Sequence, residues 1–245
     1  MTPDVDLARQ AAQAAADVLL PLRRNGLSGR ALGDAGDAAA QRAILAVLTS
    51  GRPDDVVFSE EAADDLRRLD AERVWIVDPL DGTREYGDPG RSDWAVHVAL
   101  WSAGELRAAA VALPALGEVL VTEPAPALPP RSPGQIRLAV SRSRPPSEAD
   151  VVAAALGARV VPLGSAGYKT LAVVRGEVEA YVHAGGMYQW DSAAPVAVAR
   201  AAGLTTCRLD GSPLVYNGPD PWLPDLVVCR PELADPILAA VRAGR

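Results

Sequence analysis

The stretch Val74–Thr83 reads VWIVDPLDGT. Its first four residues are apolar and predict a buried strand, which we expect to end at Asp78 because the proline that follows cannot continue it. Asp78 and Asp81 then lie together at the end of a buried strand, where two carboxylates are unfavourable unless a cation lies between them. The stretch therefore predicts a divalent-cation site. The backbone N–H groups of Gly82 and Thr83, and the Thr83 hydroxyl, are available to an anion beside the metal.

An Asp-Gly pair is also a common turn, so Asp78–Thr83 by itself is equally typical of a solvated loop. Two further segments shift the balance. Phe58–Glu61 carries an acidic pair after an apolar run, and Gln189–Ala194 reads QWDSAA. In this order, the three segments resemble the motifs of the inositol monophosphatase superfamily, whose members are metal-dependent, lithium-sensitive phosphatases.

The residues after Thr83 indicate a subfamily. Arg84-Glu85-Tyr86 is similar to the CysQ-type 3′(2′),5′-bisphosphate nucleotidases, where inositol phosphatases usually carry Thr-Asn-Phe. Val140–Ser143 and Gly164–Lys169 also resemble CysQ segments. The resemblance runs from the first predicted helix to the C-terminus and is closest to the short actinobacterial form.

The composition restricts the partners. A net charge of −7 argues against nucleic acid and anionic membranes, although bound cations still allow a phosphorylated substrate. No apolar run approaches the ~18 residues of a membrane span, and the charged N-terminal stretch is unlike a signal peptide. Two cysteines in the whole chain fit a reducing cytoplasm.

The pattern predicts a mixed α/β protein in two parts, 1–125 and 135–245, on either side of a stretch with five prolines, 123–134. The N-terminal part should be α+β and carry the metal site, and the C-terminal α/β part should complete one compact catalytic unit. Predicted helices are 5–24, 37–48, 147–156, 167–175, 191–202 and 231–243. Predicted strands are 56–58, 74–78, 93–101, 105–113, 118–122, 136–140, 158–162, 178–182 and 226–230. The resemblance implies a layered αβαβα sandwich.

Hard oxygen ligands from three separate segments predict Mg²⁺ rather than zinc, which favours Cys and His. The resemblance implies that Glu60, Asp78 and the Leu80 carbonyl hold one ion. Asp78 would bridge to a second ion, held also by Asp81 and Asp191, and the family also has a third, weaker ion near Glu60. From the residues alone, Asp191 is also a candidate N-cap of the helix that follows it.

The implied reaction is in-line attack of a metal-activated water on a phosphate monoester. The resemblance assigns the activation of that water to Thr83 and Asp37, although Asp37 near the predicted start of a helix is also typical of a cap. Lys169 is the only lysine and a candidate for a second phosphate, or else a surface residue beside a helix start. The predicted substrate-binding residues are Gly82, Thr83, Arg84, Ser165, Lys169 and Asp191.

The resemblance therefore implies a Mg²⁺-dependent phosphatase that removes the 3′-phosphate of 3′-phosphoadenosine 5′-phosphate and yields AMP. The phosphosulfate analogue is a second candidate substrate, which would place the enzyme beside sulfate assimilation. The family also suggests a homodimer. The alternative functions are an inositol-1-phosphate or fructose-1,6-bisphosphate phosphatase and, in a different class, a catalytically silent ligand-binding scaffold.

Overall fold

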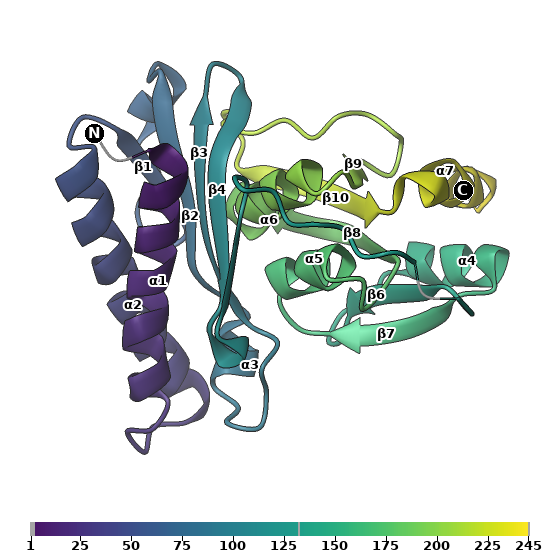
Figure 1. The fold of residues 1–245 in the computed structure, drawn as a ribbon, viewed down its shortest axis with the longest axis horizontal. Helices are drawn as coiled ribbons and strands as arrows, with labels where there is room; N and C mark the ends of the chain where they lie inside the picture. Colours follow the sequence, from purple (N-terminus) through teal and green to yellow (C-terminus); the bar gives the residue numbers. More distant parts are fainter. Residues whose placement is uncertain (1–2, 132, 245) are drawn as a thin grey trace.

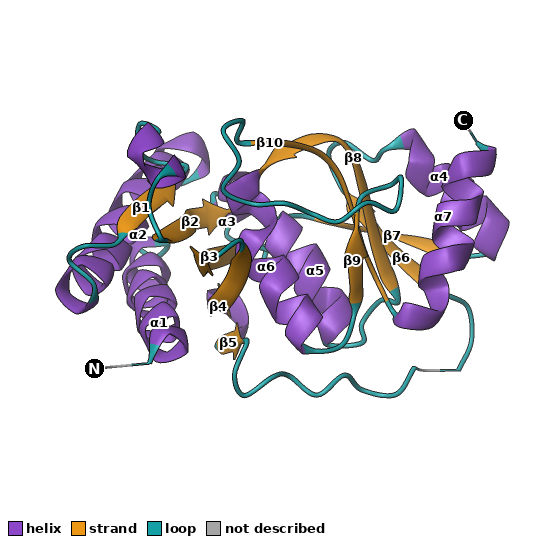
Figure 2. Cartoon of the chain, turned by 90° about the horizontal axis from the view of Figure 1, so that it is seen from above, coloured by secondary structure: helices purple, strands orange, loops and turns teal. Residues whose placement is uncertain are grey.

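The computed structural model describes residues 3–131 and 133–244, so residues 1, 2 and 245 of the two predicted parts lie outside it. The elements stack as helix, sheet, helix, sheet and helix layers, which confirms the αβαβα sandwich (Figures 1 and 2). The outer helices are α1 (Asp4–Leu22) and α2 (Gly29–Gly51) on one side and α4 (Ser147–Leu156) and α7 (Ala234–Ala243) on the other. The central layer is α5 (Ala166–Val174) and α6 (Gln189–Ala201). No helix of the described segments is both long and apolar enough to cross a membrane.

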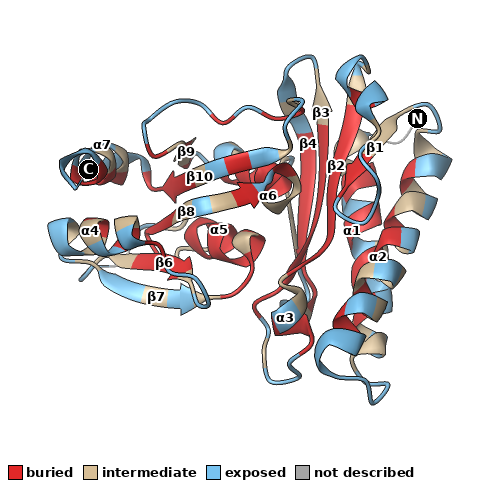
Figure 3. Ribbon diagram, turned by 180° about the vertical axis from the view of Figure 1, so that it is seen from behind, coloured by how far each residue is buried: buried red, intermediate tan, exposed pale blue. Residues whose placement is uncertain are grey.

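The first sheet follows the chain order, β1-β2-β3-β4-β5, with β1 parallel to β2 and the other pairs antiparallel. Its strands are β1 (Val56–Ser59), β2 (Arg73–Asp81), β3 (Ala95–Ser102), β4 (Glu105–Leu113) and β5 (Glu118–Val121). The central strands are buried along most of their length because α1 and α2 cover one face and α6 the other (Figure 3).

The second sheet has the order β7-β6-β8-β10-β9. Its strands are β6 (Arg137–Ser141), β7 (Arg159–Leu163), β8 (Ala180–Tyr188), β9 (Thr205–Cys207) and β10 (Trp222–Cys229). Alternate residues of β6 face opposite layers: Leu138 packs in a core with α4 and α7, and Ala139 packs in a core shared with the first sheet. The short strand β9 was not predicted, since three residues carry too little periodicity to recognise.

Strand β2 does not end at Asp78, as the proline had led us to expect, but continues to Asp81. The pairing with β1 stops at Val77, and the pairing with β3 is irregular between Asp78 and Asp81. Pro79 lies in this irregular stretch, where its missing N–H removes no ladder hydrogen bond. The carboxylates therefore project from the strand itself.

Helix α2 begins at Gly29, eight residues before Asp37, so Asp37 is an interior residue and the cap interpretation is wrong. The sequence did not predict this part of the helix because it contains Gly33 and Gly36, and glycine is a poor helix former. A Cβ at Gly33 would lie 2.5 Å from Cγ2 of Thr83, and one at Gly36 would lie 2.6 Å from the Tyr86 ring. The glycines let α2 pack closely against the short helix α3 (Thr83–Tyr86).

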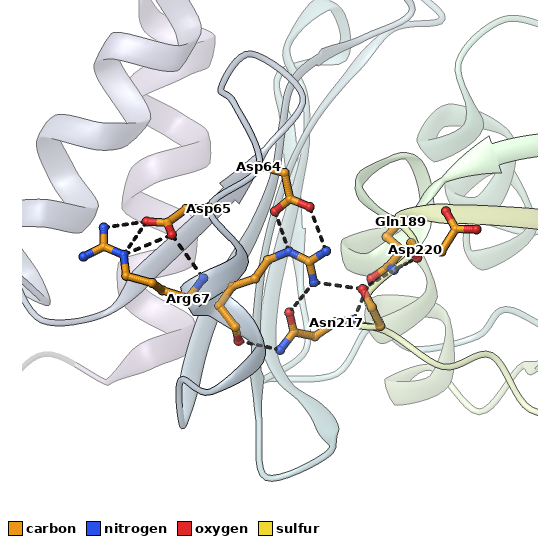
Figure 4. A network of polar contacts seen from close by, with 8 residues as sticks. Asp64, Asp65, Arg67, Gln189, Asn217 and Asp220 are labelled. Atoms are coloured by element: carbon orange, nitrogen blue, oxygen red, sulfur yellow. Dashed lines mark hydrogen bonds and ion pairs between the residues drawn. The ribbon is translucent and has the colours of Figure 1, made fainter.

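Arg68, in a short 3₁₀ helix (Leu66–Leu69), joins the segment after β1 to the loop before β10 (Figure 4). Its guanidinium donates to both carboxylate oxygens of Asp64, to Oδ1 of Asn217 and to the Gly218 carbonyl. The Asn217 amide donates back to the Arg68 carbonyl, 3.0 Å away. Arg68 is fully buried, and its guanidinium carbon lies 4.0 Å from the centre of the Phe58 ring.

We expect Arg68→Ala to lower the free energy of unfolding by about 3 kcal/mol, because it leaves Asp64 and Asn217 without their partner. Arg67→Ala is the matched control: Arg67 is 86% exposed and, among the residues that the structure describes, pairs only with Asp65, so its loss should change stability by under about 1 kcal/mol. Denaturant titration of both variants measures the difference. Equal effects would contradict a structural role for the buried arginine.

Candidate metal centre and substrate cleft

Parallel pairing of β1 and β2 brings the first two carboxylates together. The ends of parallel strands meet at one edge of a sheet, and Glu60 follows β1 there, with its N–H donating to the Val77 carbonyl at 3.3 Å. Glu60 thus lies beside Asp78. Asp78 is almost fully buried, and its Oδ1 accepts the Leu80 N–H at 3.0 Å. Its Oδ2 has no hydrogen-bond partner within the described residues, which suits a cation.

Asp81 is held by the start of α5, an element of the C-terminal half. Its Oδ2 accepts the Gly167 N–H at 2.6 Å and the Ser165 hydroxyl. The Ser165 hydroxyl in turn accepts the Tyr168 N–H, 2.9 Å away, and caps the helix. Because the N-terminus of a helix carries partial positive charge, α5 stabilises the ionised Asp81 and connects the two halves at this point.

Asp191 is the third residue of α6, so it is not the N-cap considered above; Tyr188 occupies that position. One Asp191 oxygen accepts the Tyr188 N–H at 2.6 Å. This bond fixes the carboxylate at the start of the helix, where it faces the carboxylates at the end of β2.

The carboxylates repel one another strongly. Burial, followed by repulsion from its neighbours, raises the pKa of Asp78 well above its ordinary value. Burial and Asp81 raise the pKa of Glu60 to about 7 and that of Asp191 to about 8. A cluster of this kind can ionise fully at neutral pH only with a cation among its members, and carboxylate and carbonyl oxygens suit Mg²⁺. The residues present therefore fit the predicted metal.

His97 belongs to this centre, which the sequence did not indicate. It is fully buried on β3 opposite Asp78, its Nδ1 donates to the Trp190 carbonyl at 3.1 Å, and its Nε2 lies 3.3 Å from Asp81 Oδ2. Single ligand atoms of Asp78, Asp81 and His97 all lie within 4.8 Å of one another. A Cβ at Gly167 would lie 1.9 Å from Nε2, so the glycine is required there. Only the register of β2 with β3 reveals this placement.

Thr83 and Asp37 lie on either side of the contact between α2 and α3. The Thr83 hydroxyl donates to the Leu80 carbonyl at 3.2 Å. Asp37 is four residues from Gly33, which touches Thr83, so it lies on the same face of α2. Burial and Glu61 raise the pKa of Asp37 to about 7. No hydrogen bond joins Asp37 to Thr83 within the described ranges.

A cleft of about 420 Å³ opens beside the carboxylates. Of the predicted site residues, Asp37, Asp78 and Leu80 are not among those that line it. The cleft brings together the others: Glu60, Asp81, Gly82, Thr83, Arg84, Ser165, Lys169 and Asp191.

Cationic side chains also line this cleft. Lys169 is 4% exposed, so it is not a surface residue, and its Nζ donates to the carbonyls of Gly164 (3.1 Å) and Ser165 (2.6 Å). Burial lowers the pKa of Lys169 to about 8. Arg84 and Arg144 are exposed at the same cleft, and Arg144 was not among the predicted residues. Arginine is common in this chain, and no motif distinguished Arg144 from the others.

Comparisons with known proteins agree with this geometry. The chain is 52% identical over 218 residues to the 3′-phosphoadenosine 5′-phosphate phosphatase of Mycobacterium bovis, covering 86% of this chain and 82% of that protein. It is 30% identical over 200 residues to the 3′(2′),5′-bisphosphate nucleotidase CysQ of Escherichia coli, covering 77% and 81%. These matches confirm the resemblance to the CysQ type.

The fold matches the structure of an inositol monophosphatase from Zymomonas mobilis with a TM-score of 0.79 and 24% identity, covering 98% of this chain and 97% of that one. The model of the inositol monophosphatase family matches residues 2–243. The chain therefore belongs to the inositol monophosphatase family of Mg²⁺-dependent phosphatases.

Proposed function

We propose that this protein hydrolyses the 3′-phosphate of 3′-phosphoadenosine 5′-phosphate to yield AMP and phosphate, with the phosphosulfate analogue as a second substrate. The observation that carries the proposal is the mixed charge of the cleft lining. Carboxylates suited to a metal line the cleft together with three cationic side chains, Lys169, Arg84 and Arg144. Such a cleft suits a substrate with two phosphates. The names of the M. bovis and E. coli relatives support the same assignment.

We propose two or three Mg²⁺ ions in the centre. Glu60, Asp78 and the Leu80 carbonyl would hold one ion, and Asp78, Asp81 and Asp191 a second, with the third near Glu60. When bound, Mg²⁺ neutralises the phosphate and lowers the pKa of the attacking water. Within the described residues, the buried Oδ2 of Asp78 has no hydrogen-bond partner, and the charges of Glu60 and Asp81 both act on this carboxylate, which supports its position between two ions.

The remaining residues orient the reactants. The Thr83 hydroxyl would hold the attacking water, and the Asp37 carboxylate would receive its proton, a role that a pKa of about 7 favours near neutral pH. The backbone N–H groups of Gly82 and Thr83 would bind the reacting phosphate. Lys169 and Arg84 would bind the second phosphate. Ser165 lines the same cleft, but its hydroxyl already donates to Asp81, so we expect it to act mainly by positioning that carboxylate.

Five further assignments belong to the proposal. Residues 1–125 and 135–245 would be two parts of one catalytic unit, as the bonds from α5 to Asp81 support. The enzyme would be cytoplasmic, homodimeric and sensitive to lithium. Its substrate connects it to sulfate assimilation.

The proposal predicts Mg²⁺-dependent phosphate release from adenosine 3′,5′-bisphosphate, faster than from inositol 1-phosphate or fructose 1,6-bisphosphate. Asp78→Asn should nearly abolish turnover because it removes the charge shared by two ions. Asp150→Asn, an exposed carboxylate on α4, is the control and should keep wild-type activity. Turnover of Asp78→Asn near the wild-type level at saturating Mg²⁺ would refute the metal site. Faster phosphate release from inositol 1-phosphate than from the adenosine bisphosphate would refute the proposed substrate.

The pKa values predict how pH affects the metal-free protein. The pKa values of Glu60 and Asp191 are raised from 4.5 and 3.8 to about 7 and about 8. The folded state therefore binds more protons than the unfolded chain between about pH 4 and pH 8, and its stability should fall as pH rises through that window. Mg²⁺ should restore more stability at about pH 8 than at about pH 5. Denaturant titrations with EDTA or MgCl₂ test this, and stability rising with pH in EDTA would contradict it.

Lys169→Met should raise KM for adenosine 3′,5′-bisphosphate by the equivalent of about 1–3 kcal/mol, as expected for a lost charged hydrogen bond. KM for inositol 1-phosphate, which lacks a second phosphate, should barely change. In the wild-type enzyme, KM for the bisphosphate should also rise above about pH 8, where Lys169 loses its proton, and this rise should be absent from the variant. Equal changes in KM for both substrates would contradict this role of Lys169 and would assign the binding of the second phosphate to Arg84 or Arg144.

A further inference from the structure

Two aromatic side chains at the cleft have no role in the chemistry described so far. Tyr188 and Trp222 both line the cleft, and they are 43% and 44% exposed. They are cross-strand neighbours at the ends of β8 and β10, with ring centres 5.4 Å apart and nearly perpendicular planes. Exposed aromatic rings that meet at a cleft usually mark a binding surface.

The position of the Trp222 ring is set by the backbone beneath it. A Cβ at Gly186 would lie 1.6 Å from Cζ2 of the indole, so the ring rests on a glycine whose φ of +92° also excludes most side chains. The Gly186 carbonyl accepts Nε2–H of His183 at 2.9 Å, and the Trp222 N–H donates to Asp220 at 2.9 Å. The glycine leaves room for the indole, and the two hydrogen bonds fix the backbone beneath and beside it.

Tyr188 is positioned by contacts with residues beside the candidate metal centre. It stacks on Trp190, with ring centres 4.8 Å apart and an interplanar angle of 14°, and Trp190 meets the buried Phe58 edge to face. The Tyr188 N–H donates to Asp191 at 2.6 Å. A flat group on these rings would therefore lie at a constant distance from the carboxylates, as the base of a nucleotide does from its 3′-phosphate.

We propose that Trp222 and Tyr188 form a platform for the base of a purine nucleoside bisphosphate, in which the base stacks on the Trp222 indole and meets Tyr188, whose plane is nearly perpendicular, at its edge. The inference rests on the proposed function and adds a third contact to it. In that function the metals bind the reacting phosphate and Lys169 binds the second phosphate; the aromatic pair would bind the base. Met187, which precedes Tyr188 on β8 and also lines the cleft, adds an apolar and polarisable surface. Stacking uses the face of the base, so the platform selects substrates that carry a base over those that lack one.

The test compares adenosine 3′,5′-bisphosphate with its abasic analogue, 1-deoxyribose 3,5-bisphosphate, which keeps the 2-hydroxyl. The wild-type enzyme should prefer the nucleotide in kcat/KM by about 5- to 150-fold, the range expected for one base–aromatic stack. Trp222→Ala should remove most of this preference and leave kcat/KM for the abasic compound within about 2-fold of wild type. Trp222→Phe should retain most of the preference, because a phenyl ring still stacks. Leu116→Ala, an exposed apolar residue outside the cleft, should change neither substrate.

Several results would overturn the platform. A wild-type enzyme that hydrolyses both bisphosphates equally has no base site, although its phosphatase function stands. If Trp222→Ala lowers kcat/KM equally for both substrates and Trp222→Phe recovers none of it, the indole supports the structure and does not bind the base. A changed oligomeric state in Trp222→Ala, measured by light scattering, would make the pair an interface between copies. Hydrolysis of neither bisphosphate by the wild-type enzyme would overturn the proposed function and this inference with it.

Discussion

Repulsion among carboxylates at the junction of the two sheets constrains the rest of the molecule. Asp78 and Asp81 project from an irregular stretch of β2, where Glu60 and Asp191 converge on them. The protein offsets part of this repulsion with its own dipoles, since the start of α5 donates hydrogen bonds to Asp81. The remaining charge requires a cation. Under the proposed ligand assignment, metal binding and the docking of the C-terminal half on the first sheet would therefore be coupled through one aspartate.

Close backbone approach is the second requirement, and glycines meet it. Gly33 and Gly36 bring α2 against Thr83 and Tyr86, and Gly167 leaves room for His97 beneath Asp81. Away from the metal, Arg68 anchors the segment after Glu60 to the loop before β10. A cation–aromatic contact, an edge-to-face ring pair and a stacked ring pair lead in turn from Arg68 towards the rim of the cleft. The site thus depends on contacts between segments about 150 residues apart in the chain.

Much of this arrangement could be predicted from the sequence. Alternating and helical apolar patterns located every strand but β9 and every long helix, because burial of one face imposes those periods. The acidic motifs around Asp78 and Asp191 and the lone Lys169 identified residues that the structure gathers around one cleft. Local rules failed at Pro79 and in the first turns of α2. There, an irregular pairing and close packing override the usual preferences of proline and glycine.

The sequence by itself determined the fold class, the family and the acidic residues that we propose as metal ligands, because these depend on residue type and local order. Only the tertiary structure decided which groups face one another. It placed His97 opposite Asp78 through strand register, buried Lys169 with its ammonium on two carbonyls, and set Arg144, Tyr188 and Trp222 around the cleft. The reason is physical: these neighbours come from different strands and loops, and no local pattern of apolar or charged residues records their distance in space.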